Sequence, residues 1–437
     1  MQKHRNHKVV IVGGGAGGLE LASRLGRRFG SRHVTLIDKN LFHIWKPSLH
    51  EVAAGTLDIH KEGLSYAMLA KHCGFTFVPG EVRGVDRDAQ TVELGPLTSE
   101  QGEEFVPRRG VQYDSLVIAV GSRSNFFGTP GASEHAFALD SMTEAERFRL
   151  KLLRALHLVN VAKQVGSGRQ LNIVIVGGGA TGVELAAELR EACANIALYG
   201  LTGLEPQRDV RITLMEGAPR ILAPLPEKLS KAAHGLLSAR GIDIMTNVRV
   251  ASVDANGLKD SSGNFYPADI CVWAAGIEAP AFLKNFGLAT NRLNQLIVDE
   301  FLCTDDRHVF ALGDCAQAPW AARSKSVPAR AQAAHQQASY LFKVMTGRIL
   351  QRSTSSRRPF DYHDRGSLVS VGQAEGVGSL MGVLTGKSLF VKGQLARLMY
   401  MSLHLMHHQA VIGTLPTMLA ALGRLLLKRT APRVKLH

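Results

Sequence analysis

Two stretches of the chain share one pattern of apolar and glycine residues. Residues 9–25 and 173–189 are identical at 12 of 17 aligned positions, at an offset of 164 residues. Each begins with a continuous apolar run, passes through three glycines and continues with apolar residues at helical spacing. The pattern predicts a buried strand, a tight turn and a helix, which is the first half of a βαβ unit.

Each repeat is followed by a second predicted strand that ends in an acid. Residues 33–38 end at Asp38, and residues 210–216 end at Glu216. One further buried strand is predicted for each unit, at 114–121 and at 270–276. Strands that alternate with helices indicate an α/β protein with two Rossmann-like dinucleotide-binding domains.

Shorter segments connect and follow the two units. Residues 76–78, 82–86 and 91–94 are expected to form an antiparallel meander. A strand is expected within 309–315, and a helix from about Pro328 to Met345 with the proline in its first turn. Residues 351–359 are polar and are expected to be a linker.

The glycines have specific physical uses in such a turn. Gly13 lets the chain leave the strand sharply, Gly15 lets a pyrophosphate approach the backbone, and Gly18 lets the helix pack against the sheet. The helix start then presents free N–H groups and a positive dipole end to the phosphates. The second copy repeats the arrangement with Gly177, Gly179 and Gly182. The alternative is that the two glycine turns bind no ligand. It is a poor one, because both copies of the motif are complete.

The acids after the two turns suggest the nucleotides. Asp38 lies 20 residues beyond Gly18, the spacing expected of a carboxylate that accepts from ribose hydroxyls. Glu216 lies 34 residues past Gly182, and the excess maps to an insertion at 194–208. A carboxylate there repels a 2′-phosphate and so favours NADH over NADPH, although the nearby Arg220 argues the other way.

Composition narrows the function. The net charge is +14, with many basic residues late in the chain, which favours a surface-docking region over simple solubility. The five cysteines form no close pair, so neither a zinc site, nor any other metal site, nor a disulfide framework is expected. We expect no secretory signal, and no run of 18 apolar residues is present.

These motifs resemble the glutathione reductase-like flavoproteins with two dinucleotide-binding domains, over about residues 8–345. The resemblance implies FAD on the first turn and NAD(P)H on the second. Residues 309–315 (VFALGDC) are similar to the second flavin motif, in which Asp314 accepts from the ribityl chain, unless it is an ordinary turn acid. The resemblance also implies that Val82 and Gly121 contact FAD and that Gly276 contacts NADH.

The electron acceptor needs a separate argument. Residues 39–52 contain no cysteine, which excludes disulfide chemistry because a thiolate pair is required. Residues 43–55 (HIWKPSLHEVAAG) and 331–337 (AQAAHQQ) resemble segments of type II NADH:quinone oxidoreductases, as do residues 364–372. Gln332 and Gln336 share a helix face and are implied to bind a flavin edge and a quinone carbonyl, the alternative being an exposed polar face.

The same resemblance implies further roles. Glu184 is expected near the nicotinamide and the flavin, although its twin Glu20 leaves a structural role open at both positions. Lys46 is implied near the flavin and Lys387 near the quinone entry, whereas a solvated lysine is the alternative for each. The expected domains are 1–122 with 286–350 for FAD, 123–285 for NADH, and 351–437 as a C-terminal region.

The C-terminal region carries apolar faces beside basic residues. Residues 392–406 place Leu395, Leu398, Met399, Ser402 and Met406 along one predicted helical face, and residues 411–427 form a second apolar set. Gly413, Pro416, Gly423 and Arg424 are expected to interrupt that second set. An interfacial helix on anionic lipid is expected, because the basic residues Lys428, Arg429, Arg433 and Lys435 follow directly. Packing on the body or a homodimer is the alternative.

The sequence therefore predicts a non-proton-pumping NADH:quinone oxidoreductase. It is expected to lie peripherally on the cytoplasmic face of the inner (plasma) membrane, with a homodimer as an option and no nucleic acid partner. Three rivals stay open: a sulfide:quinone oxidoreductase, a ferredoxin-type reductase, and an NADH-responsive flavoprotein with a signalling or nucleic-acid role through its basic tail.

Overall fold

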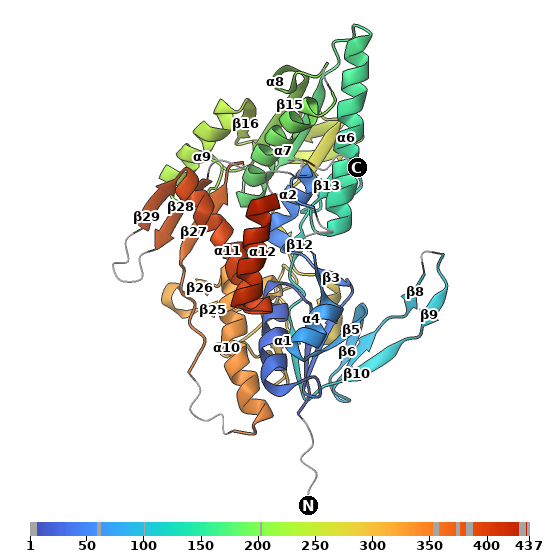
Figure 1. Ribbon diagram of the computed structural model, residues 1–437, viewed down its shortest axis with the longest axis vertical. Helices are drawn as coiled ribbons and strands as arrows, with labels where there is room; N and C mark the ends of the chain where they lie inside the picture. Colours follow the sequence, from blue (N-terminus) through green and yellow to red (C-terminus); the bar gives the residue numbers. More distant parts are fainter. Residues whose placement is uncertain are drawn as a thin grey trace, which may run out of the picture.

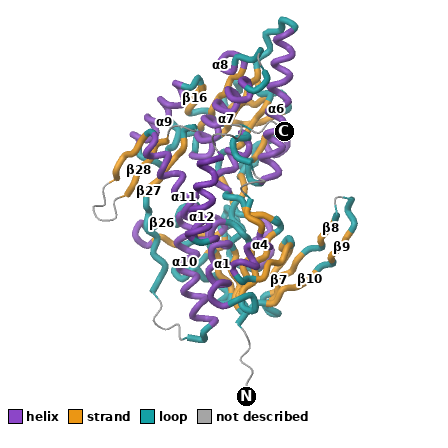
Figure 2. Tube along the Cα trace, in the orientation of Figure 1, coloured by secondary structure: helices purple, strands orange, loops and turns teal. Residues whose placement is uncertain are grey.

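The computed structural model describes residues 7–58, 63–99, 101–201, 203–352, 358–372, 376–381, 388–427 and 434. Two α/β lobes lie one above the other, and two C-terminal helices run across their front (Figure 1). Helices surround strands in both lobes (Figure 2). The predicted fold class is confirmed.

The lower lobe is built on a five-stranded sheet in the order β23-β11-β1-β2-β5. Every neighbouring pair in it is parallel. Four of its strands are fully or largely buried apolar runs, as expected of a parallel sheet with helices on both faces, whereas the edge strand β5 is only partly buried. The strands are β1 (Val9–Val12), β2 (Val34–Asp38), β5 (Thr76–Pro79), β11 (Ser115–Ile118) and β23 (Val309–Ala311).

The upper lobe repeats this plan in the order β13-β20-β14-β15-β16, again with parallel neighbours. The helix after each central strand is α1 (Ala16–Phe29) in the lower lobe and α7 (Ala180–Leu198) in the upper. The strands are β13 (Ala136–Ala138), β14 (Leu171–Val176), β15 (Val210–Glu216), β16 (Ile242–Thr246) and β20 (Ile270–Trp273).

One strand prediction was wrong. Thr76–Pro79 does not belong to a meander, because β5 pairs in parallel with β2 at the edge of the lower sheet. The other two segments do form antiparallel strands, β6 (Val82–Asp86) and β7 (Thr91–Leu94), which β10 (Arg109–Gln112) extends. A short apolar run has the same sequence pattern in a parallel edge strand and in an antiparallel hairpin. The sequence of residues 76–79 therefore does not distinguish these two structures.

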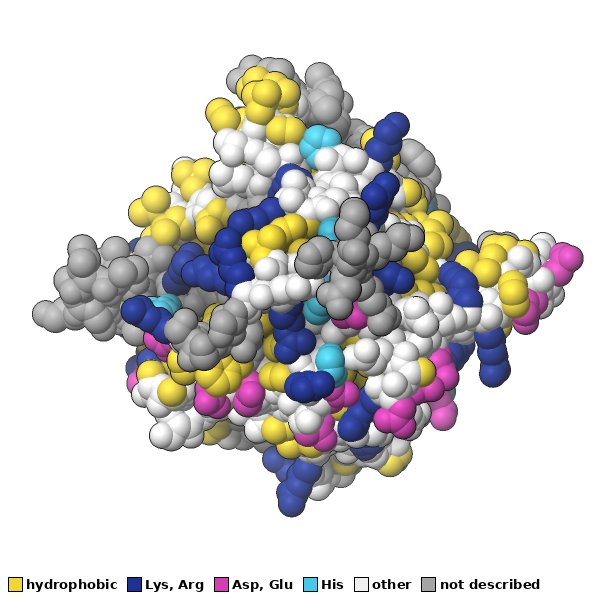
Figure 3. Space-filling view, turned by 90° about the horizontal axis from the view of Figure 1, so that it is seen from below, with side chains coloured by type: hydrophobic (Ala, Val, Ile, Leu, Met, Phe, Trp, Pro, Cys, Tyr) yellow, Lys and Arg dark blue, Asp and Glu magenta, His cyan; other side chains and the backbone are white. Residues whose placement is uncertain are grey.

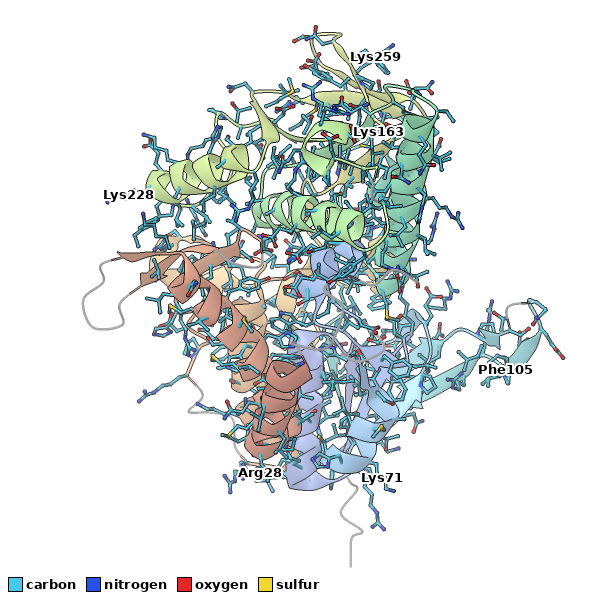
Figure 4. The ribbon with its side chains drawn as sticks, turned by 45° about the horizontal axis from the view of Figure 1, so that its top comes forward. Arg28, Lys71, Phe105, Lys163, Lys228 and Lys259 are labelled. Atoms are coloured by element: carbon cyan, nitrogen blue, oxygen red, sulfur yellow. The ribbon has the colours of Figure 1, made fainter. Side chains whose placement is uncertain are left out.

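Smaller elements complete the two lobes. A hairpin of β8 (Leu97–Thr98) and β9 (Glu104–Val106) projects from the lower lobe, with Phe105 far out on it (Figures 1 and 4). The strands β12 (Arg123–Ser124) and β21 (Ile277–Glu278) pair with each other, and β17 (Val250–Asp254), β18 (Gly257–Asp260) and β19 (Phe265–Pro267) form a small sheet. Among the described residues, the other α-helices of the two lobes are α2 (Leu49–Ala54), α4 (Tyr66–Cys73), α5 (Ala132–His135), α6 (Met142–Gln164), α8 (Pro206–Asp209), α9 (Glu227–Ala239) and α10 (Ala331–Ile349).

The C-terminal region consists of an antiparallel sheet and two helices. The sheet contains β27 (Gly366–Ser370), β28 (Gly376–Met381) and β29 (Ser388–Lys392), and the helices are α11 (Gln394–Ile412) and α12 (Thr414–Leu427). Val369 and Val377 join the core of the upper lobe, whereas Val411 joins the core of the lower lobe. This region therefore packs on both lobes.

Two helix boundaries differ from those predicted. Helix α10 begins at Ala331, three residues after Pro328, because Arg330 is its extended N-cap. Helix α12 runs unbroken through Pro416 and Gly423, since a proline in the first turn needs no N–H partner there. Within the described residues, none of the helices is long and apolar enough to cross a membrane.

Candidate functional site

The two glycine turns have the same steric need at the strand exit. Gly13 and Gly177 take positive φ values of 101° and 111°. A Cβ on Gly13 would lie 2.4 Å from the carbonyl oxygen of Ala119, and one on Gly177 would lie 2.7 Å from the carbonyl of Ala274. Both the conformation and the close neighbouring strand therefore require glycine.

The third glycine of each turn is required by helix packing. A Cβ on Gly18 would lie 2.0 Å from the Gly13 carbonyl oxygen, and one on Gly182 would lie 1.9 Å from that of Gly177. Each helix thus rests directly on the turn that precedes it.

The middle glycine of each motif differs, because nothing in the protein requires it. A Cβ on Gly15 would meet no atom closer than 4.0 Å, and one on Gly179 would meet none within 4 Å. These glycines are the N-caps of α1 and α7, and neither helix start has a side-chain cap. An open backbone at an uncapped helix start fits a pyrophosphate, whose oxygens need close N–H donors. The residues present therefore fit two dinucleotides.

The acids hold the same position beside each turn. Asp38 accepts from the backbone N–H of Gly14, and Glu216 accepts from that of Gly178, each at 2.7 Å. Both acids come from the end of the second strand of their sheet. The guanidinium of Arg220 instead donates to the backbone carbonyls of residues 222, 223 and 225. Its donors are thus directed to the chain itself and not to Glu216.

Asp314 lies in a small polar group at the carboxyl edge of the lower sheet. Its carboxylate accepts from the Ser122 hydroxyl at 2.8 Å, and the Ser122 carbonyl accepts from Lys46 Nζ at 2.6 Å. Gly121, with φ of +72°, precedes Ser122 and has open space where a Cβ would be. The structure therefore brings together Lys46, Gly121 and Asp314, which the sequence placed at the flavin. Val82 lies apart from this group, buried at the start of β6.

Gly276 lies at the corresponding edge of the upper sheet. It has φ of +69°, and a Cβ there would lie 2.3 Å from the ring of Phe127. Phe127 itself is exposed and has a positive φ of 52°. An aromatic ring thus covers the position predicted to contact NADH.

Glu184 is a buried carboxyl group at the junction of three chain segments. It projects from α7, its Oε1 accepts from the backbone N–H of Ser370 at 3.0 Å, and its Oε2 lies 3.7 Å from Nδ1 of His50. Burial raises the pKa of Glu184 to about 8, although the hydrogen bond from Ser370 opposes this. Burial also lowers the pKa of His50 to about 4. Both groups are therefore neutral at pH 7, which suits a site that holds or transfers a proton.

The twin residue Glu20 has different surroundings. It is also buried, but it accepts from Arg24 at 3.0 Å and pairs with His335 Nδ1 at 2.6 Å. An arginine and a histidine partner thus hold Glu20 in a paired, structural position. Glu20 and Glu184 thus occupy the same position in the sequence repeat but differ in their chemical surroundings.

Gln332 and Gln336 lie on one face of α10, as predicted. Gln332 donates to the Gly366 carbonyl at 2.9 Å and accepts from the N–H of Arg365 at 3.1 Å. Gln336 donates to the His363 carbonyl at 2.9 Å and accepts from its N–H at 3.0 Å. Both amides are thus held by the segment that leads into β27, so two of the quoted motifs are in contact.

Sequence reasoning missed several residues of this region. Tyr66 and His43 both donate to the carbonyl of Gly14, at 2.7 and 2.9 Å, and Gln337 accepts from the N–H of Gly313 at 2.7 Å. His43 lies in the motif at residues 43–55, and Gln337 lies in the motif at residues 331–337. Only the tertiary contacts show which residues these two side chains bind. Lys387, Lys428, Arg429, Arg433 and Lys435 lie outside the described residues.

Two open glycine cradles with matched acids define a flavoprotein class that holds two dinucleotides, and the comparisons agree. Residues 7–338 match the pyridine nucleotide-disulphide oxidoreductase family. The chain is 40% identical to the type II NADH:quinone oxidoreductase of Haemophilus influenzae, with 98% of this chain and 99% of that protein covered. It is 28% identical to the Staphylococcus aureus protein so named, with 88% and 93% covered. The chain belongs to the type II NADH:quinone oxidoreductases within that family.

Solved structures agree on the fold. NDH2 from Plasmodium falciparum in complex with NADH has a TM-score of 0.82 at 19% identity, with 99% of this chain and 100% of that chain covered. The sulfide:quinone oxidoreductase of Aquifex aeolicus has a TM-score of 0.69 at 18% identity, with 98% and 96% covered. The second match shows that proteins with different electron donors share this architecture.

Proposed function

We propose that this chain oxidises NADH and passes the electrons through bound FAD to a quinone at a membrane surface. The observation that carries the proposal is the pair of open glycines, Gly15 and Gly179, each at an uncapped helix start beside an acid. One cradle alone would fit a simple dehydrogenase or a simple flavoprotein, whereas two fit electron transfer between two dinucleotides.

For FAD we propose the lower lobe. Gly13, Gly15 and Gly18 shape the pyrophosphate turn, and Asp38 accepts from ribose hydroxyls. Asp314, Lys46 and Gly121 form the polar group at the same sheet edge, and Val82 supplies backbone near the adenosine. When bound, FAD supplies the ring that accepts a hydride and returns electrons to the quinone.

For NADH we propose the upper lobe. Gly177, Gly179 and Gly182 bind the pyrophosphate, Glu216 binds the adenosine ribose, and Gly276 lies along the nicotinamide half. The carboxylate of Glu216 disfavours a 2′-phosphate, so NADH is preferred to NADPH. The boundaries 1–122 with 286–350, 123–285, and 351–437 are proposed as the corresponding domains.

Glu184, Gln332 and Gln336 are the proposed catalytic residues. Reduction of a quinone takes up two protons, and a hydride from NADH carries only one of them. Glu184 is protonated at pH 7 and lies between α2, α7 and β27, so we propose that it holds a proton for this chemistry. Gln332 and Gln336 are proposed to orient the quinone carbonyl when their hydrogen bonds to residues 363–366 exchange for it.

We propose contact with a membrane surface from the exposed residues of α11 and α12, which the structure describes. Leu395 and Leu398 of α11 and Leu415, Met418 and Leu419 of α12 are all at least 60% exposed. Basic side chains gather among apolar ones on the lower face, where Arg28 and Lys71 lie (Figures 3 and 4). Apolar side chains beside cations fit a surface of anionic lipid. A peripheral position on the cytoplasmic face of the inner membrane is proposed, with a homodimer through the same face as the alternative and no nucleic acid partner.

A sulfide-oxidising role has little chemical support. Cys315 follows Asp314 directly, but it is buried and burial raises the pKa of its thiol to about 12. A thiol that stays protonated is a poor nucleophile.

The proposal is tested by steady-state turnover of the purified, flavin-loaded protein with a short-chain ubiquinone. We expect NADH-dependent quinone reduction that persists in a Cys315→Ser variant and that sulfide does not replace. Turnover with sulfide but not with NADH would overturn the assignment.

A further inference from the structure

Helix α11 is attached to the lower lobe at two points. At its C-terminal end, Arg27 of α1 donates from Nη1 to the Val411 carbonyl at 2.7 Å and from Nη2 to the Ala410 carbonyl at 2.8 Å. The last carbonyls of a helix have no partner inside it and form the negative end of its dipole, so a guanidinium is well suited to them. The second point is one turn earlier, at His407.

At this second point, two hydrogen bonds connect α11 with the first glycine turn. Nε2 of His407 lies 2.8 Å from Nε2 of His43, and Nδ1 of His43 lies 2.9 Å from the carbonyl oxygen of Gly14. A carbonyl can only accept, so His43 donates from Nδ1. A neutral imidazole then has no proton on Nε2, so His407 must donate to His43. The chain of bonds therefore depends on a neutral His43, whose unprotonated Nε2 is the acceptor.

Aromatic neighbours enclose the two rings. The His407 ring lies 4.5 Å from the Trp45 ring, centroid to centroid, at an interplanar angle of 32°. His404 and His408, one turn apart on α11, stack at 4.4 Å. Despite four histidines here, the described residues contain no group of three or more ligands able to hold a metal ion. The cluster is thus an interface between α11 and the segment that begins at Phe42.

Among the described residues, no carboxylate faces the pair directly. Burial lowers the pKa of His43 and of His404 to about 4, and it holds the pKa of His407 well below its usual range. The neighbouring histidines add to this effect. The groups that face the pair are His404 and His408 on α11, His335 on α10 (itself paired with Glu20), Tyr66 on α4 and, at the helix end, Arg27 on α1.

We propose that His43 and His407 form a latch that joins α11 to the first glycine turn while the His43 imidazole is neutral, and that mild acid opens it by protonating His43 at Nε2. A proton added to His43 at Nε2 would point at the N–H of His407. The face of Trp45 attracts an imidazolium, but the cost of burying a charge without a carboxylate exceeds that attraction.

The direction of the pH effect follows from linkage. A freed His43 takes up a proton near pH 6.5, whereas the latched His43 resists protonation down to about pH 4. The latch is therefore fully stable above pH 6.5 and weakens as the pH falls towards 4. Arg27 keeps its charge throughout, so α11 stays attached at its end. The latch rests on these contacts alone and not on the proposed function, although it would link the proposed membrane helix to the FAD turn.

Hydrogen–deuterium exchange of the purified, flavin-loaded protein tests the latch. Exchange is measured at pH 7.5 and 5.0, corrected for intrinsic rates, with peptides from α9 as the internal control, because α9 carries neither Glu184 nor His50. We expect α11 to exchange at least about tenfold faster at pH 5.0 relative to α9. Unchanged protection of α11 at both pH values would overturn the proposal, and this comparison needs no variant.

Three variants sharpen the test. The double variant His43→Gln with His407→Gln keeps a donor and an acceptor but cannot take up a proton, so α11 should be protected equally at both pH values. His407→Phe keeps a ring but no donor, so exchange should be fast already at pH 7.5. Arg27→Gln should speed exchange at both pH values by the same factor. A double glutamine variant with the wild-type pH ratio would also contradict the latch.

Discussion

The backbone N–H of Ser370 donates to the buried carboxyl group of Glu184 at 3.0 Å. Ser370 ends β27 in the C-terminal region, whereas Glu184 lies in the first turns of the helix that follows the second glycine turn. The segment that also binds Gln332 and Gln336 is therefore joined to the proposed NADH lobe at a protonatable group. This contact is the physical basis for placing proton transfer between the two half-reactions.

Glu184 should make stability depend on pH. Its folded pKa is about 8 against an ordinary value of 4.5, so the folded state keeps a proton that the unfolded state releases. The stabilisation is full below pH 4.5 and is lost as the pH rises through 8. Between pH 6 and 9 the free energy of unfolding should fall by about 2–3 kcal/mol from this group. Urea unfolding of wild type and Glu184→Gln should show that fall only in wild type, and equal slopes would contradict it.

Substitutions in the two glycine turns should affect FAD binding and NADH binding separately. A valine side chain at Gly15 enters the space proposed for the FAD pyrophosphate, so Gly15→Val should purify without flavin. Gly179→Val should keep its flavin but raise the KM for NADH at least about tenfold, because only the second turn is blocked. Flavin absorbance and initial rates measure both effects. Loss of flavin from Gly179→Val alone, with Gly15→Val still yellow, would reverse the assignment.

Much of this arrangement was predictable from sequence because it is local. The strand, the three glycines and the acid are close in the chain, and the steric reasons for Gly13 and Gly18 follow from backbone geometry. Glu184 and Glu20 show the limit. They occupy one position in the repeat, yet one contacts Ser370 and His50 and the other contacts Arg24 and His335.

The remaining differences have the same origin. Residues 76–79 form a parallel edge strand because β2 offers a free edge, which no pattern within four residues reveals. The contacts of His43 with Gly14 and His407 join positions up to 364 residues apart. Such contacts depend on how complete helices and strands pack against one another.

Glu216 should set the choice between NADH and NADPH. Glu216→Gln keeps an acceptor for the ribose but removes the charge that repels a 2′-phosphate, so the ratio of kcat/KM for NADH over NADPH should fall by about tenfold or more. Glu205→Gln, at an exposed acid in the same lobe, is the matched control. An unchanged ratio in Glu216→Gln would remove this carboxylate from the specificity argument.

The apolar face should decide membrane binding. Replacing Leu398 and Leu419 by glutamine removes two exposed side chains worth about 1.5–3 kcal/mol each if fully buried in lipid. Flotation with vesicles that contain anionic lipid should therefore fall at least about tenfold. Leu158→Gln with Val161→Gln, at two exposed positions of α6, is the control and should float like wild type. If flotation is unchanged and a dimer dissociates instead, the face is a subunit interface.

Anaerobic stopped-flow spectroscopy of the bound flavin tests the central claim most directly. NADH should bleach the flavin absorbance much faster than NADPH does, and a short-chain ubiquinone should then restore it. A flavin that NADH leaves oxidised, or that stays reduced after quinone is added, would contradict electron transfer from NADH to quinone through two dinucleotide cradles.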